Sequence, residues 1–330
     1  GTSTGDMAGD YTMMSLAYKR DLSDRLSMGF YLNTPYGANA LYTQGPYTGL
    51  TATWESEQIA AVLRYEVQAG LSVYGGARYV RSQAEIAIPD TVIRNGLAAA
   101  GLAGNVLAGN LAANAPLGSL AYTADGSRTG DVGYIAGAAY ERPDIALRVA
   151  LTYESEIEHG FRTRETLAAV EGLFGPFPVT QTNIRMPQTL TLDFQSGVAQ
   201  DTLVFGSIRW AEWSVWEVRP AGFDSVFGDN VTDFENDVIT YQLGVGRRIN
   251  ESLSVFVRGG YEDAKGGIAS RLAPTDGQKS LGVGGTYTVG NAKITGGIEY
   301  VDIGGAVDGS GTRFRGNSAL GFGLSVGYRF

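Results

Sequence analysis

The only histidine of this chain, His159, is the side chain best suited to acid–base chemistry near neutral pH. A hydrolase would also need a serine or another nucleophile in the same site. No nucleophile motif flanks His159 in the sequence. The chain also has no cysteine, which excludes disulfides and thiolate metal sites. We therefore expect no catalytic residue, no cofactor and no enzymatic activity.

Three carboxylates close to this histidine share one face of the chain. Glu154, Glu156 and Glu158 are two positions apart, and this spacing puts them on the same side of an extended strand. Such a row could bind calcium, which prefers oxygen ligands. It could also be a solvated rim of charges, and this is the interpretation we favour. The sequence therefore predicts no metal site.

Two segments with helical spacing carry apolar side chains outside any alternating stretch. Residues 97–113 and 167–177 place leucine, valine and phenylalanine at intervals typical of short amphipathic helices in loops. Exposed apolar side chains indicate a binding site, although these could instead pack on one another as a lid. The candidate ligand-binding residues are Leu97, Leu102, Val106, Leu107, Leu111, Leu167, Val170, Phe174 and Phe177.

Most of the remaining chain has a period of two. Residues 320–330 alternate apolar side chains with glycine, serine or arginine and end at Phe330. A soluble sandwich strand has this pattern with its apolar face toward a core, and a transmembrane barrel strand has it with that face toward lipid. Twelve further stretches between residues 11 and 300 repeat the pattern, so we expect thirteen strands.

The lengths of the connections decide between these alternatives. Six connections are short turns, and the six between them are long. This alternation is typical of an up-and-down barrel with periplasmic turns and extracellular loops. Arg64, Arg148, Asp193 and Arg258 then all fall on the lumen face, away from lipid. Residues 1–330 are predicted to form one all-β domain, a transmembrane antiparallel up-and-down β-barrel with short helices in its extracellular loops.

The composition agrees with an outer-membrane barrel and limits its partners. The chain is 44% hydrophobic and 18% charged, and its 47 glycines and 18 tyrosines suit a lumen face of small residues between aromatic girdles. A net charge of −9 without a basic patch argues against nucleic acid. No uninterrupted apolar run of about 18 residues is present, so we expect no membrane-spanning helix. The four tryptophans are interpreted as anchors at the membrane interface.

Several stretches in order resemble the FadL family of outer-membrane transporters for long-chain fatty acids and other hydrophobic compounds. They are Leu26–Gly37, Ala150–Phe161, Met186–Leu192, Trp210–Trp213 and Asp237–Tyr261. The resemblance implies a 14-stranded barrel, of which thirteen strands are visible; the N-terminal hatch and the first strand have no counterpart. It also implies passive uptake of hydrophobic molecules in a Gram-negative outer membrane. Long-chain fatty acids are the first expected ligands, and aromatic hydrocarbons are the second.

The same resemblance suggests a route and two charged residues. Pro35, Tyr36 and Gly37 match a kinked strand where ligand leaves sideways into the membrane, and both proline and glycine disturb strand pairing. Arg219 and Glu262 fall where the family places lumen charges, so Arg219 would meet a ligand carboxylate. We expect a monomer in contact with outer-membrane lipid and lipopolysaccharide. The alternative is a general porin for polar solutes or a structural barrel.

Overall fold

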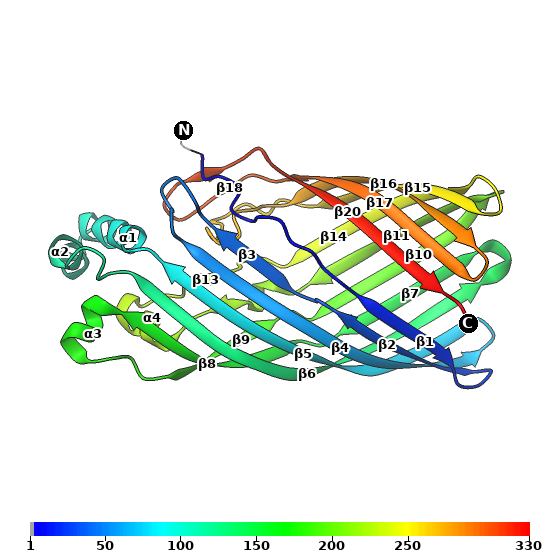
Figure 1. Cartoon of the computed structure of the whole chain (residues 1–330), viewed down its shortest axis with the longest axis horizontal. Coiled ribbons are helices and arrows are strands. Elements are labelled where there is room, and N and C mark those ends of the chain that lie inside the picture. Colours follow the sequence, from blue (N-terminus) through cyan, green and yellow to red (C-terminus); the bar gives the residue numbers. More distant parts are fainter. Residues whose placement is uncertain (1–2) are drawn as a thin grey trace.

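The computed structural model describes residues 3–330. Thirteen strands follow one another in a single antiparallel sheet that wraps into an elongated barrel (Figure 1). Each strand pairs with the next one of the series, which confirms the predicted up-and-down arrangement and the strand count. In sheet order they are β1 (Leu16–Asp21), β2 (Leu26–Asn33), β4 (Thr51–Gln68), β5 (Leu71–Ile88), β6 (Tyr122–Arg142), β7 (Leu147–Glu154), β10 (Thr189–Ala199), β11 (Thr202–Ala211), β14 (Val238–Arg248), β15 (Leu253–Glu262), β16 (Gln278–Val289), β17 (Ala292–Ile303) and β20 (Asn317–Tyr328).

The first and last strands of this series meet at a seam. Tyr18 of β1 and Phe330, just after β20, stack with their ring centroids 6.0 Å apart. Within residues 3–330 no hydrogen-bonded ladder joins β1 to β20. The backbone ladder therefore runs round the wall from β1 to β20, and aromatic side chains meet at the seam.

Side chains alternate between the outer and inner faces of the wall. Val257 on β15 and Tyr79 on β5 point outward and are more than two-fifths exposed. Ser72 and Arg78, on the opposite parity of β5, are buried. A protein group replaces water around the buried Arg78 guanidinium, which donates to the backbone carbonyl of Ser155 at 2.7 Å. The apolar outer band and polar inner face have the arrangement of a membrane barrel.

Three strands extend well beyond the others at the loop end of the barrel. β4 and β5 have 18 residues each, and β6 has 21. Roughly nine to eleven residues are enough to cross the hydrocarbon core. The extra length carries charged side chains on its outer face, among them Glu55, Glu57 and Arg81. These upper ends therefore stand above the apolar band.

The long connections hold four short α-helices at this end of the barrel (Figure 1). They are α1 (Asp90–Leu102), α2 (Val106–Asn114), α3 (Ala168–Phe174) and α4 (Ala221–Phe227). The first three confirm the helices predicted from apolar spacing. None of the helices in the described part of the chain is long and apolar enough to cross a membrane.

One of the long connections expected from the sequence, at residues 156–185, is mostly a β-hairpin and not an irregular loop. β8 (Ile157–Leu167) pairs with β9 (Thr180–Met186) and also with the upper part of β6. Alternate residues of β8 are buried, but His159 and Glu165 are among them. Burial therefore alternates along β8 but hydrophobicity does not. The sequence consequently carries no hydrophobic alternation from which this strand could be predicted.

Several smaller elements complete the loop end. They are β3 (Gly37–Leu41), β12 (Glu217–Val218), β13 (Thr232–Asp233), β18 (Ala306–Val307), β19 (Arg313–Phe314) and the 3₁₀ turn η2 (Trp213–Val215); a further 3₁₀ turn, η1 (Pro143–Ile145), lies at the opposite end.

Two apolar clusters hold the loop end together. The loop core joins α1 to the upper strands through Tyr42, Tyr47, Leu50, Ile88, Val92, Ile93, Leu120, Tyr122, Ala124, Leu167 and Phe314. The inner core lies within the barrel and consists of Trp54, Val80, Ile157, Phe161, Ile184 and Met186. The β8–β9 hairpin supplies most of the inner core, so the hairpin fills space inside the wall rather than extending away from it.

Candidate ligand-binding site

A cavity of about 1500 Å³ lies at the loop end of the barrel. Its walls come from β3, the upper part of β4, the β12–β13 hairpin and the loops at residues 262–277 and 305–315. This volume exceeds the roughly 300–1,000 Å³ usual for small-molecule sites. The cavity has room for a hydrophobic molecule of moderate size and for its movement.

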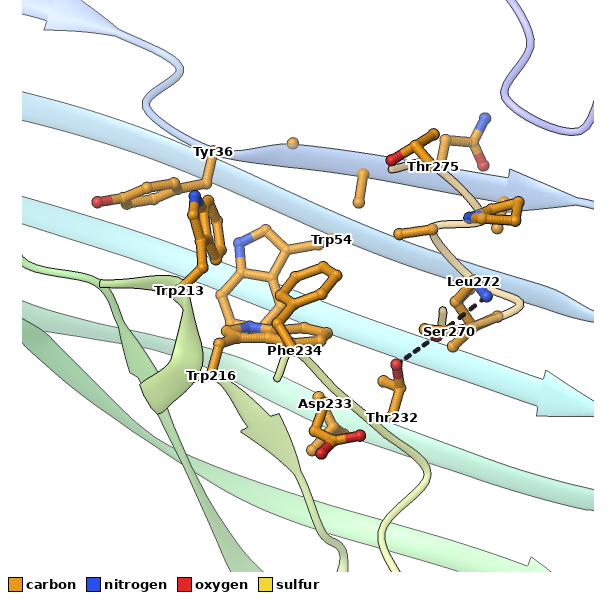
Figure 2. A pocket seen from close by; sticks show the side chains of 18 of the residues that line it. Tyr36, Trp54, Trp213, Trp216, Thr232, Asp233, Phe234, Ser270, Leu272 and Thr275 are labelled. Carbon is orange, nitrogen blue, oxygen red and sulfur yellow. Dashed lines mark hydrogen bonds between the residues drawn. The ribbon is translucent and has the colours of Figure 1, made fainter. Parts of the chain in front are cut away.

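Five aromatic residues form one side of the cavity, which we call the aromatic wall: Tyr36, Trp54, Trp213, Trp216 and Phe234 (Figure 2). Trp216 stacks on Phe234 with ring centroids 4.7 Å apart, and Trp213 meets Phe234 edge-on at 5.5 Å. Tyr36 lies edge-on to Trp213 at 6.2 Å. Aromatic faces bury much apolar area at little entropic cost, so this wall suits a flat, apolar ligand.

The interpretation of the tryptophans as interface anchors is wrong for three of the four. Trp54, Trp213 and Trp216 line the cavity, whereas Trp210 donates its indole N–H to Asp237 at 3.1 Å. The parity of β4 is a signal for Trp54, because it shares the inward face with Ser56. Trp213 and Trp216 reach the cavity from a loop, where no periodicity exists to place them.

Acidic side chains outnumber basic ones around the cavity. Among the described residues that line it, eight are acidic and five are basic. The basic side chains are Arg81, Arg128, Lys265, Arg313 and Arg315. An excess of carboxylates raises the free energy of a bound anion. The electrostatics therefore favour an uncharged ligand over a carboxylate.

The strand pairing of the wall is interrupted beside this cavity. β2 pairs with β4 as far as Asn33, which lies opposite Gln58. β3 resumes the pairing with Gly37 opposite Glu55. Residues 34–36 between them form no ladder with β4. The wall consequently has a short gap in its backbone hydrogen bonds, which we call the wall interruption.

Residues of the wall interruption border the cavity directly. Pro35 and Tyr36 line it, and so does Gly37, the first residue of β3. Ser56 and Glu57, at the matching level of β4, line it as well, although they alternate to opposite faces of that strand. The cavity therefore reaches both faces of β4 at the level where the pairing is broken.

The nine apolar loop residues separate into two groups, and none of the nine is among the described cavity-lining residues. Leu97, Leu111, Leu167, Val170 and Phe177 belong to the loop core or pack against it. Leu102, Val106, Leu107 and Phe174 are exposed, with between 73 and 92% of their surface accessible. The first group stabilises the loop core, and the second presents apolar surface to the outside.

The two predicted lumen charges lie in different surroundings. Glu262 lines the cavity, but Arg219 does not. Arg219 lies between β12 and α4 and forms ion pairs with Glu217 at 2.8 Å and Asp224 at 2.9 Å. These carboxylates raise the pKa of Arg219 above its ordinary value. The positive charge of Arg219 is thus already matched by its own loop.

His159 has a serine and a carboxylate beside it that sequence proximity could not reveal. Its Nε2 lies 3.1 Å from Ser82 Oγ, and its Nδ1 lies 3.2 Å from Asp131 Oδ2. This order of groups is that of a hydrolytic triad. However, Ser82 and His159 are fully buried, and neither is among the cavity-lining residues. The three residues link β5, β6 and β8 by side-chain hydrogen bonds, and we call them the His159 cluster.

The three spaced glutamates do not converge on a common point. Glu154 pairs with Arg78 at 3.5 Å, and Glu156 pairs with Arg185 at 3.9 Å. Glu158 accepts a hydrogen bond from Asn183 at 3.0 Å. Within residues 3–330 no group of three His, Asp or Glu side chains is placed to hold a metal ion.

Comparison with known proteins gives a family and a fold. The model for outer membrane protein transport proteins (OMPP1/FadL/TodX) matches residues 1–307. No curated protein matches the sequence significantly. A FadL homologue from Pseudomonas aeruginosa superimposes with a TM-score of 0.70 at 14% identity, over 95% of this chain and 77% of that one. The Pseudomonas putida toluene transporter TodX gives 0.59 at 15%, over 98 and 82%. The Ralstonia pickettii toluene transporter TbuX gives 0.60 at 16%, over 96 and 80%.

Proposed function

We infer the function of this chain from its family: it belongs to the OMPP1/FadL/TodX outer membrane transport proteins, which are transporters and not enzymes. We propose that it lets hydrophobic small molecules cross the outer membrane passively. The observation that carries this proposal is the aromatic-walled cavity beside the wall interruption. A cavity of this kind can bind an apolar molecule, and the interruption offers it a way out.

Uncharged aromatic molecules are the ligand class that the cavity favours. Its aromatic wall complements flat rings, and the acidic excess among its lining residues opposes a carboxylate. Arg219, the cation expected for a fatty acid, is engaged by Glu217 and Asp224 outside the cavity. Long-chain fatty acids, the first expectation from the sequence, are therefore the second candidate here.

The proposed route has three steps. Exposed apolar side chains at the loop tips, such as Leu102 and Phe174, first hold the ligand by burying its surface, worth about 0.8 kcal/mol per methylene. The ligand then moves into the cavity against the aromatic wall. It finally leaves sideways at Pro35, where the proline ring leaves no N–H for a neighbouring strand.

An open porin for polar solutes is less well supported. The side chains of Trp54, Phe161 and Met186 are buried together inside the barrel. Such an inner core occupies space that a water-filled channel would need. A porin would also gain nothing from a wall of tryptophans at its mouth.

Uptake by a porin-deficient Gram-negative host tests this function. Cells expressing the chain should take up labelled toluene faster than cells with an empty vector, and sucrose at the vector rate. Replacing Trp213 and Trp216 with Ala should reduce toluene uptake severalfold, whereas Trp210→Phe, which lies off the cavity, should not. Raised sucrose uptake with unchanged toluene uptake would instead establish the porin.

A further inference from the structure

Trp54 carries the one feature of the aromatic wall that hydrocarbon binding alone leaves unexplained. The residue is 8% exposed, and its ring meets Phe161 edge-on at 5.4 Å and lies 6.0 Å from the ring of His159. Its indole nitrogen is shielded from solvent and has no hydrogen-bond partner within the described residues. Buried donors are nearly always paired, because an unpaired one loses its bond to water without replacement.

The surroundings of this N–H show why it lacks an acceptor. Figure 2 shows the nitrogen of Trp54 on the edge of the ring that faces Trp213 and Tyr36. The hydroxyl of Ser56, two positions along the same face of β4, already accepts from the backbone N–H of Tyr36 and donates to its carbonyl. The donor therefore points at aromatic side chains of the cavity and away from polar protein groups.

Trp54 and Trp213 differ in the kind of backbone that carries them. Trp54 is paired on both sides of β4, with Ala38 of β3 and Ala84 of β5. Trp213 begins the three-residue turn η2, in a loop, where it meets Phe234 and Tyr36 edge-on and packs against the inner core. A ligand that enters between Trp54 and Trp213 would displace the loop residue and leave the strand residue in place.

We propose that the indole N–H of Trp54 selects ligands within the transported class. This selection rests on the proposed function. The preferred ligands are flat, uncharged, apolar molecules that carry one hydrogen-bond acceptor, such as aromatic ketones, ethers and esters. The indole N–H only donates, so it recognises an acceptor and gives nothing to a second donor. A pure hydrocarbon leaves the donor unpaired, and a site with an unpaired polar group discriminates against such a ligand.

A matched pair of probes isolates this hydrogen bond. Acetophenone and ethylbenzene have similar size and shape, but only acetophenone carries a carbonyl acceptor. Binding of each is measured by calorimetric titration of the whole chain in detergent micelles, with empty micelles as the blank. Trp54→Phe keeps an aromatic ring and removes the donor. It should weaken acetophenone about fivefold more than ethylbenzene, which is the size of one neutral hydrogen bond, because the smaller ring affects the packing of both probes alike.

The other outcomes separate the two proposals. Equal weakening of both probes would reduce Trp54 to a packing surface, and no change for either would remove it from the site; both results overturn the selection by Trp54 while ethylbenzene binding upholds the proposed function. Failure of the wild-type chain to bind either probe would overturn the function itself, and the selection with it.

Spectroscopy of the unaltered chain gives a second, independent test. With indole ¹⁵N labelling, the four tryptophans give four side-chain N–H signals. The Trp54 signal is assigned by its absence in Trp54→Phe, or by elimination with Trp210→Phe, Trp213→Phe and Trp216→Phe if that variant does not fold. Acetophenone should move it downfield, the direction of a new hydrogen bond, and ethylbenzene should not. Identical shifts with both probes would contradict the proposal.

Discussion

The backbone N–H of Tyr36 donates to the side-chain hydroxyl of Ser56 at 3.0 Å, at a level where backbone bonds would otherwise join two neighbouring strands. The same hydroxyl donates back to the carbonyl of Tyr36. One serine side chain thus satisfies both backbone groups of a residue that has left the ladder. The wall holds its shape here without being closed by strand pairing.

Restoring the ladder at the wall interruption should slow transport. Pro35→Val supplies the missing N–H, and Gly37→Ala reduces backbone freedom. A Cβ at Gly37 would meet no atom within 4 Å, so the alanine fits without strain. We expect the double variant to insert at wild-type levels, to be at least as stable, and to take up toluene several times more slowly. Normal uptake at normal insertion would rule out lateral exit at this place.

A matched change in the opposite direction checks the same model. Ser56→Ala removes the hydroxyl that holds Tyr36 but leaves Pro35 and every other cavity-lining side chain unchanged in type. Uptake by this variant should equal or exceed that of the wild type. If Ser56→Ala and the Pro35/Gly37 variant slowed uptake alike, general damage to the wall would explain both.

The strands of the barrel were predictable because each one experiences a simple environment. Lipid outside and a polar lumen inside impose hydrophobic alternation, which Val257 and Ser254 follow on β15. The β8–β9 hairpin was not predictable from this signal, since neither of its faces meets lipid. Its buried face mixes Phe161 with Glu165, which is stabilised by hydrogen bonds from the backbone N–H groups of Gly222 and Phe223. Polar residues satisfied by distant partners leave no periodic pattern.

The candidate site was predictable only where the chain departs from strand chemistry. Pro35 and Gly37 stand out within an alternating stretch, and the structure places both on the cavity. The aromatic wall combines Tyr36 and Trp54 with Trp213 and Trp216, about 160 residues further along the chain. The curvature of the sheet brings these segments together, and no spacing within one segment encodes that contact.

The outward alternation makes a direct prediction about insertion. Val257 faces outward on β15, whereas Ser254 faces the interior. Val257→Arg would place a charge in lipid at a cost of about 2–4 kcal/mol near mid-depth, and Ser254→Arg would place it in the lumen. The yield of folded protein in lipid vesicles should fall sharply for Val257→Arg only. The pair Leu192→Arg and Thr191→Arg on β10 should behave in the same way, and equal yields within both pairs would refute the assigned faces.

The role of the exposed loop tips can be tested without disturbing the loop core. Leu102, Val106 and Phe174 are at least 73% exposed, so changing all three to Ser should leave stability nearly unaltered. Uptake at low ligand concentration should fall severalfold if these side chains capture ligand. Leu167 lies in the loop core and is 1% exposed, so Leu167→Ser is the contrasting variant and should destabilise the loop core. Unchanged uptake by the triple variant would limit these residues to a surface role.

The His159 cluster should make the β8–β9 hairpin sensitive to acid. Burial lowers the pKa of His159 below its ordinary value of 6.5, despite the nearby Asp131. Above pH 6.5 the imidazole is neutral whether the hairpin is folded or not, and its burial costs no charge. As the pH falls from about 6.5 through the lowered pKa, the unfolded form binds the proton more readily, and folded hairpin is lost. Protection of the hairpin from proteolysis should therefore decrease between pH 7.5 and 5. His159→Gln can still bond to Ser82 without titrating, so its protection should stay constant, and a parallel decrease in that variant would assign the acid sensitivity to other groups.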